Sequence, residues 1–216
     1  GYIPSYLDAF FETVSGFTTT GSSIMPDVEI LPQCMHFWRS FTHWIGGMGV
    51  LVFILSLLPL TGGYHMNLMK AESPGPSVSK LVPKVQSTAK ILYTIYIILT
   101  IVEIIFLLIG KMPLFDTLCL SFGTAGTGGF GVKNDSIASY STYNQVVITV
   151  FMILFGINFN AYYLLLTKKV MQAAKNEEVR YYLGIIGLAI VAIAINTREM
   201  FTSFGRAFQQ AAFQVG

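Results

Sequence analysis

The stretch DAFFETVSGFTTTGS at residues 8–22 has a second copy in outline, DTLCLSFGTAGTGGF at residues 116–130. In each copy an aspartate opens a mostly apolar segment of about two helical turns, which runs into a Thr/Gly cluster. The glycine that closes the cluster, Gly21 or Gly129, lies 13 residues after its aspartate. Such a repeat in an apolar chain predicts pore loops, in which a short helix dips into the bilayer and an extended strand offers its carbonyls to a dehydrated ion.

The composition indicates a membrane protein. Hydrophobic residues make up 53% of the 216 residues and charged residues only 11%, whereas a soluble domain carries about 25% charged residues. Because about 20 apolar residues are needed to cross a bilayer as a helix, the long uncharged stretches predict membrane-spanning helices. The expected spans are 37–60, 90–110, 144–167 and 181–197.

The charges predict which loops face which side. Two connections, after the first and third expected spans, hold eight of the 13 basic residues, so the positive-inside rule places them in the cytoplasm. Both Thr/Gly clusters and seven of the 11 acidic residues then lie outside, where an acidic vestibule would concentrate cations. The net charge of +2 needs no nucleic-acid partner, because the basic residues flank the membrane. The eight basic residues are Lys70, Lys80, Lys84, Lys90, Lys168, Lys169, Lys175 and Arg180.

The Thr/Gly clusters are the candidate ion site. As filter strands they would replace part of the hydration shell of an ion, with glycine supplying backbone torsions that other residues avoid. An ordinary helix C-cap also uses Thr and Gly, but a second copy at the same spacing favours the filter. The second cluster is richer in glycine and keeps only the hydroxyl of Thr127, which indicates a filter less uniform than the TVGYG type. The expected filter residues are Thr19, Thr20, Gly21, Thr127, Gly128 and Gly129.

Three other patterns do not support catalysis. Residues 126–131 satisfy G-x-G-x-x-G but lack the strand and the later acidic residue of a dinucleotide site. An intramembrane serine protease using Ser15 and His43 would need a G-x-S-x-G context, which is missing. No H-E-x-x-H or clustered ligand set predicts a metal site, so we expect no enzyme and no metal beyond potassium. Cys34 and Cys119 are expected to be unpaired.

Several polar residues in the predicted spans allow two interpretations. Glu103 is a functional candidate by its position in a span, although a structural partner across a helix interface is favoured. His43 and Arg39 could bond carbonyls of a pore helix. Asn158 and Asn160 could face a wet cavity or bond a neighbouring helix.

Taken together, the motifs resemble the Trk/Ktr/HKT superfamily of potassium transporters, and within it the TrkH family. The resemblance extends along essentially the whole chain. The sharpest discriminator is the loop motif KAESPGP followed by PK and TAK, which hydrophobicity alone would not produce. The matching stretches are FETVSGFTTTGS (11–22), WRSFTHWIGGMGVLV (38–52), KAESPGP (70–76), PKVQSTAKILYTIY (83–96), TGGFG (127–131) and GINFN (156–160).

The resemblance implies an all-α membrane protein with repeated helix–pore-helix–filter–helix units, of which four surround one potassium-channel-like pore. This sequence would hold about two of the four and look like a fragment. AAFQV at 211–215 mirrors AFFET at 9–13, which suggests the start of a third pore helix. The expected division is 1–62 for the first unit without its first helix, 63–89 for a cytoplasmic loop, 90–168 for the second unit, 169–180 for another cytoplasmic loop and 181–216 for the start of the third unit.

The resemblance also implies the function. We expect inward potassium uptake across a bacterial cytoplasmic membrane, with potassium as the substrate and no covalently bound cofactor. A sodium-permeable or sodium-coupled potassium transporter of the Ktr or HKT type is the alternative. The implied partners are the lipid bilayer, a second copy in a homodimer and a TrkA-like cytoplasmic nucleotide-binding subunit, for which Lys80, Lys84 and Lys90 are candidate contacts.

Overall fold

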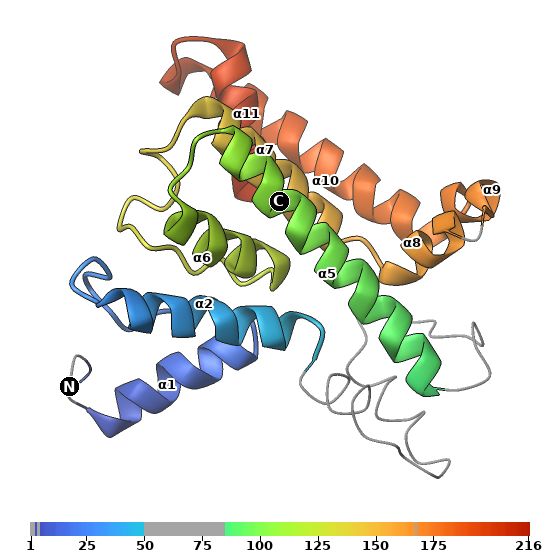
Figure 1. Cartoon of the computed structure of the whole chain (residues 1–216). Helices are drawn as coiled ribbons and strands as arrows, with labels where there is room; N and C mark the ends of the chain where they lie inside the picture. Colours follow the sequence, from blue (N-terminus) through green and yellow to red (C-terminus); the bar gives the residue numbers. More distant parts are fainter. Residues whose placement is uncertain (1–2, 4, 50–84, 167) are drawn as a thin grey trace.

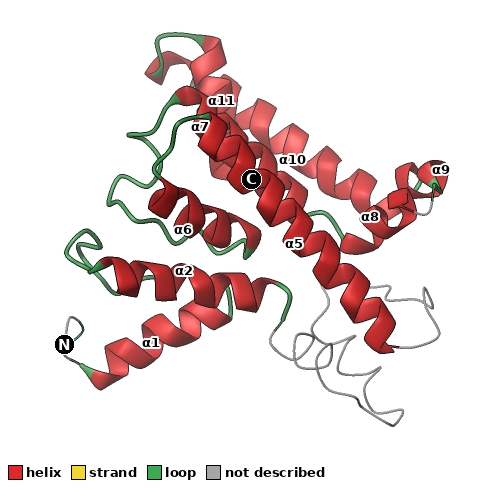
Figure 2. Ribbon diagram, in the orientation of Figure 1, coloured by secondary structure: helices red, strands yellow, loops and turns green. Residues whose placement is uncertain are grey.

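The structure is a computed structural model that describes residues 3, 5–49, 85–166 and 168–216. Every regular element in this part of the chain is a helix, as Figure 2 shows, so the all-helical prediction is confirmed there. The elements are α1 (Tyr6–Phe17), α2 (Gln33–Gly47), α5 (Val85–Ile109), α6 (Leu114–Ala125), α7 (Thr142–Phe155), α8 (Phe159–Leu166), α9 (Val170–Ala174), α10 (Glu177–Asn196), the 3₁₀ turn η1 (Arg198–Met200) and α11 (Phe204–Val215).

The helices repeat with one spacing. α1 and α6 are both 12 residues long, and both of their ends are 108 positions apart. The helix that follows each of them, α2 or α7, ends at Gly47 or Phe155, which is the same separation. Asp8 and Asp116 lie in the first turns of α1 and α6, where a carboxylate suits the helix dipole. The repeat seen in the sequence is therefore a repeat of helices as well.

Two described helices are long and apolar enough to cross a membrane. They are Ala89–Ile109 within α5 and Glu177–Asn196, which is α10. α10 starts earlier than the uncharged stretch because the side chain of Asn176 caps it by accepting from the N–H of Glu178. The first expected span begins within α2, and its part beyond residue 49 lies outside the described residues, as do KAESPGP and Lys80 and Lys84.

The expected span 144–167 is not one straight helix, and it crosses a membrane as a single span only if its two bent halves count together. α7 ends at Phe155, and α8 starts at Phe159 after a bend of 89°. A break inside a membrane leaves backbone carbonyls that need donors, and two tyrosines supply them. The hydroxyl of Tyr162 donates to the carbonyl of Leu154 at 2.6 Å, and that of Tyr182 donates to Ile153 at 3.1 Å.

Asn158 lies in this break and connects it to α10 by a hydrogen bond. Its side-chain amide donates to the carboxylate of Glu178 on α10 at 2.8 Å, and its Oδ1 accepts from the N–H of Asn160. Of the two roles open for Asn158, the structure thus shows the bond between helices.

The helices pack in a continuous series, which Figure 1 allows the reader to follow. α1 packs on α2, α2 on α6, α6 on α5 and α7, α7 on α11, and α11 on α10. In a bilayer such contacts depend on close packing and interhelical hydrogen bonds. At the contact between α2 and α5 the indole of Trp44 donates to the Thr100 hydroxyl at 3.2 Å, and the Tyr96 hydroxyl donates to the Trp44 carbonyl at 2.9 Å. The buried core lies mainly among α5, α6 and α7.

α11 starts in the same way as α1. The Ser203 hydroxyl accepts from the N–H three residues later, as the Ser5 hydroxyl does at the start of α1. Matching these caps pairs Phe204 with Tyr6, which differs by one helical turn from the pairing of AAFQV with AFFET. The similarity of the segment holds, but its register shifts because the cap, rather than the apolar pattern, sets where the helix starts.

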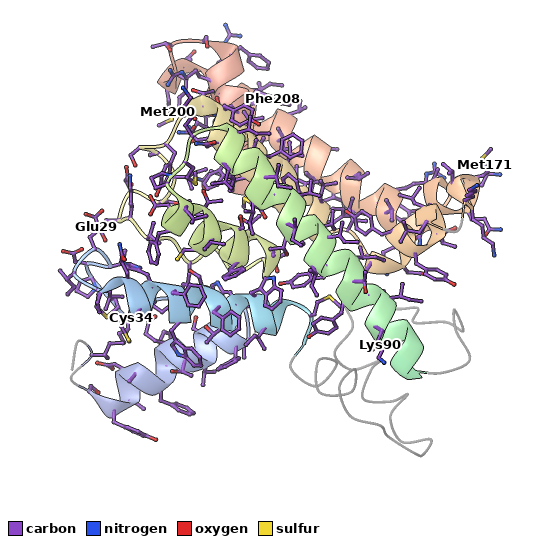
Figure 3. The ribbon with its side chains drawn as sticks, viewed as in Figure 1. Glu29, Cys34, Lys90, Met171, Met200 and Phe208 are labelled. Carbon is purple, nitrogen blue, oxygen red and sulfur yellow. The ribbon has the colours of Figure 1, made fainter. Side chains whose placement is uncertain are left out.

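The two ends of the molecule differ in the residues they carry. Figure 3 shows Lys90, near the start of α5, and Met171, on α9, at one side, with Glu29 and Met200 at the other. The loops that follow α1 and α6 share the side of Glu29 (Figure 1). Lys90 and the outer loops therefore lie at opposite sides of the molecule.

Candidate functional site

The two Thr/Gly strands are the non-helical segments 18–21 and 126–129, and they leave their helices through the same backbone hydrogen bonds. The N–H of Thr19 donates to the carbonyl of Gly16 at 3.1 Å, and the matched N–H of Thr127 donates to that of Thr124 at 2.9 Å. At the next position the two N–H groups also donate five residues back, to Ser15 at 3.0 Å and to Gly123 at 3.1 Å. The strands thus turn back along the ends of α1 and α6 in one conformation.

The torsions of the strands match as well. Thr19 and Thr127 both have φ of 53°, which is uncommon for a threonine, and Gly21 and Gly129 have φ of 74° and 80°. Two left-handed residues separated by one other residue occur in each strand. Glycine is suited to the second position because it has no Cβ to collide with the backbone.

The structure brings the two strands together. A Cβ at Gly21 would overlap the carbonyl oxygen of Gly128, so the first strand lies directly against the second although they are 108 positions apart. Gly129 has no atom within 4 Å of the place of its missing Cβ. All six expected filter residues therefore belong to one pair of neighbouring strands.

The first strand is held from behind by a buried ion pair. Glu12 on α1 and Arg39 on α2 are 4% and 6% exposed at their side chains, with 3.1 Å between Nε and Oε2. The other carboxylate oxygen of Glu12 accepts from the Ser23 hydroxyl and from the N–H of Ile24, both at 2.6 Å. Arg39 also donates to the Ser23 hydroxyl at 3.2 Å. This network fixes the chain just beyond Gly21.

The second strand has no such pair at the matched positions. Glu12, Ser23 and Arg39 correspond to Leu120, Gly131 and Val147 at the common separation of 108. Leu120 and Val147 belong to the hydrophobic core cluster between α5, α6 and α7. A cavity of about 230 Å³ lies alongside this strand and is lined by residues of α6, α7 and α11 as well as by the strand.

α2 supports both strands at once. A Cβ at Gly46 would overlap the Phe17 carbonyl oxygen and lie 2.9 Å from the Thr19 side chain, whereas one at Gly47 would lie 2.7 Å from the Cα of Gly126. Glycine at these positions lets the end of α2 approach the bases of the two strands.

Side chains of α2 reach further along the second strand. The guanidinium of Arg39 lies 4.2 Å from the ring centre of Phe130, and the ring of His43 stacks on the same Phe130 at 3.9 Å. The expectation that Arg39 bonds pore-helix carbonyls is therefore wrong: its donors meet the Glu12 carboxylate and a hydroxyl. A buried guanidinium needs a negative partner, which carbonyls do not provide. Glu12 was not identified from the sequence as the partner of Arg39. The available signal was the acidic residue at position 12, where the second copy of the motif has Leu120.

The outer loops that follow the strands are joined to each other. Asn134, beyond the second strand, donates from its amide to Asp27 at 2.7 Å and accepts from the N–H of Val28 at 2.9 Å. Its own N–H donates to Glu29 at 3.1 Å. Beside this junction is an open hollow of about 530 Å³ whose lining includes Glu29, Asp116, Asp135, His36 and Lys133.

Tyr140 lies in the outer loop after the second strand. Its hydroxyl donates to the carboxylate of Asp116 on α6 at 2.8 Å. Burial, followed by this hydrogen bond, raises the pKa of Tyr140 above its ordinary value of 10.0.

The other residues singled out in the sequence lie away from the two strands or bond only to neighbouring backbone. The Ser15 hydroxyl donates to the carbonyl of Ser22 at 2.6 Å, which ties the loop to α1. Glu103 is fully buried on α5, and its polar neighbour Thr124 on α6 lies outside hydrogen-bonding geometry. Cys34 and Cys119 are unpaired, as expected. Among the described residues no three His, Cys, Asp or Glu side chains gather to hold a metal ion.

Comparison with known proteins gives consistent matches. The family described as "TrkH: Cation transport protein" matches residues 3–190. The Trk system potassium uptake protein TrkH of Salmonella typhimurium is 32% identical over 96% of this chain, and that of Vibrio parahaemolyticus is 35% identical over 97%. The chain spans 44% and 45% of the length of these two relatives.

A solved structure shares the fold. The crystal structure of the potassium transporter TrkH from Vibrio parahaemolyticus superposes with a TM-score of 0.80 and 29% sequence identity. The match covers 99% of this chain and 44% of that one. With the family match over most of its length, this chain belongs to the TrkH family of cation transport proteins.

Proposed function

We propose that this chain forms two neighbouring sides of a potassium-conducting pore in a bacterial cytoplasmic membrane. Its six filter residues would be Thr19, Thr20, Gly21, Thr127, Gly128 and Gly129. The observation that carries the proposal is the contact of Gly21 with the Gly128 carbonyl, between strands of the same conformation. Relatives that are named potassium uptake proteins support potassium as the substrate.

The physical basis is the backbone. Strands that alternate left-handed residues with others hold their carbonyls in a fixed array, which can stand in for the water shell of a cation. The C-terminal ends of α1 and α6 lead into these strands, so the partial negative charge of each helix dipole favours a cation there. No covalent chemistry is required, and the membrane potential would drive inward movement.

The rest of the assembly follows from the family plan. We propose the unit division 1–62, 90–168 and 181–216, with cytoplasmic connections at 63–89 and 169–180. The remaining sides of the pore would come from further units. A second copy of the protein and a TrkA-like nucleotide-binding subunit are the proposed partners, and Lys90 lies on the side of the molecule that such a subunit would meet.

The test is rubidium uptake and potassium-dependent growth in cells that lack their own potassium systems. The full-length protein would be compared with its Gly21→Ser and Gly129→Ser variants. We expect the wild type to restore growth and both variants to lose uptake or to admit sodium, because serine at these φ values strains the strand.

Gly131→Ser is the matched control. Gly131 lies two residues beyond the strand, its φ is not positive, and a Cβ there would make ordinary contacts of 3.7 Å or more. Ser is also the residue at the matched position 23. Filter variants that behave like the control would exclude these strands as the filter, and sodium uptake by the wild type would favour the sodium-permeable alternative.

A further inference from the structure

One side chain from the first unit lies against the second filter strand. A Cβ at Gly128 would overlap Cε1 of the His43 ring and lie 2.6 Å from both ring nitrogens. A Cβ at Gly126 would overlap the carbonyl oxygen of His43. His43 therefore touches this strand with both its ring and its backbone.

The ring of His43 has little freedom to move. The residue is fully buried, and its ring stacks on Phe130 with 3.9 Å between ring centres and 19° between ring planes. Neither ring nitrogen has a partner within hydrogen-bonding geometry among the described residues. The backbone of Ser15 on α1 faces the ring but lies outside hydrogen-bonding geometry. Packing against Phe130 and Gly128 is therefore the main restraint on the ring, and an apolar ring of similar shape would keep these contacts.

The first strand carries its own side chain at the matched position. The position matched to Gly128 is Thr20, whose hydroxyl lies 2.8 Å from that of Thr18 in a hydrogen bond. In the second strand the position carries no side chain, and the ring from α2 occupies the space next to it. The two strands thus have the same backbone conformation, but the space beside the matched position is filled by the Thr20 side chain in one and by the His43 ring in the other.

We propose that His43 is a specificity-determining residue of the pore. Its ring holds the Gly128 peptide in place, and the placement of that carbonyl sets the preference for potassium over sodium, since selection depends on the geometry and stiffness of the coordinating carbonyls. His43 is a positioning residue that acts through Gly128. The inference rests on the proposed function of the strands.

The test combines two substitutions in the full-length protein. His43→Ala removes the ring and is expected to lower the potassium-to-sodium ratio of uptake about tenfold, which corresponds to about 1.4 kcal/mol. His43→Phe keeps a ring and is expected to retain most of the selectivity. Gly128→Ala should block uptake by collision with the ring, and His43→Ala should restore part of it, because φ at Gly128 is not positive and alanine is tolerated there once space exists.

Leu107→Ala is the control for lost packing alone. Leu107 is fully buried in the core on α5, so its truncation is expected to lower the melting temperature with an unchanged ion ratio. A His43→Ala variant with the wild-type ion ratio, or a double variant no better than Gly128→Ala, would overturn the proposal.

A second readout does not need transport. In purified protein the loss of melting temperature caused by Gly128→Ala should shrink when His43 is also alanine, and stabilisation by potassium relative to sodium should fall in His43→Ala. If the wild type takes up no rubidium, the proposed transport function fails. The thermal cycle and the ion-dependent stabilisation then still decide whether His43 shapes an ion-selective strand, and purely additive thermal effects would overturn it.

Discussion

The first and second filter strands share a backbone conformation but not the means that hold it. Behind the first strand, Glu12, Arg39 and Ser23 form a buried charged network. Behind the second, Leu120 and Val147 pack in an apolar core, and His43 lies against Gly128. The repeated units therefore share the backbone hydrogen bonds of the strand, whereas the side chains packed behind the strand differ between them.

The two kinds of support should fail in different ways. A buried ion pair is strongly destabilised when one partner is lost, because the other charge stays in a low-dielectric site without compensation. Apolar packing weakens in proportion to the volume removed.

Single changes in the ion pair should have the largest effect. Glu12→Leu or Arg39→Val alone should cost about 3–5 kcal/mol of stability, because each leaves one buried charge unpaired. The double variant installs the residues of the second unit and should recover much of that loss. Thermal unfolding of the purified protein measures it, and a double variant as unstable as the sum of the singles would contradict the comparison.

The closing glycines should respond unequally. Gly129→Ala meets no neighbouring atom and should cost only the left-handed strain of about 1–2 kcal/mol. Gly21→Ala adds an overlap with the Gly128 carbonyl and should disturb both strands. Rubidium uptake with sodium competition measures this, and equal effects of the two changes would show that the strands do not touch as described.

The junction of the outer loops should make a smaller contribution. Asn134→Ala removes two side-chain hydrogen bonds, each worth about 0.5–1.5 kcal/mol, while the backbone bond to Glu29 remains. We expect a modest loss of melting temperature and easier proteolysis of the outer loops. Asn134→Asp keeps the acceptor for Val28 but faces Asp27 with a like charge, so a variant as stable as wild type would argue against the junction.

Tyr140→Phe should have the smallest effect at neutral pH, about 1 kcal/mol for one lost hydrogen bond. Because the pKa of Tyr140 is raised in the folded protein, its contribution is complete below the unfolded pKa of 10.0 and is lost as the pH rises above it. Wild type should therefore lose stability more steeply than Tyr140→Phe above pH 10. If the melting temperatures of wild type and Tyr140→Phe fall equally with pH above 10, the pKa of Tyr140 is not raised.

The short helices α1 and α6 and the break after α7 differ in how local their sequence signals are. The short helices expected after Asp8 and Asp116 are α1 and α6, because an apolar run between an acidic start and a Thr/Gly end is a local signal. The break at 156–158 was missed because the span contains no charge, and its carbonyls are satisfied by Tyr162 and Tyr182 from other parts of the chain. A hydropathy profile does not show which side chains donate to the carbonyls of a break.

The amino-acid order was sufficient for the repeat and for the all-helical class of the described residues. These depend on spacing, composition and residue type, which are local properties of the chain. Only the tertiary structure decided that Glu12 pairs with Arg39, that Gly21 lies against Gly128 and that His43 lies against the second strand. Those contacts join residues far apart in the chain, so the packing of α2 between α1 and α6 determines which side chains meet.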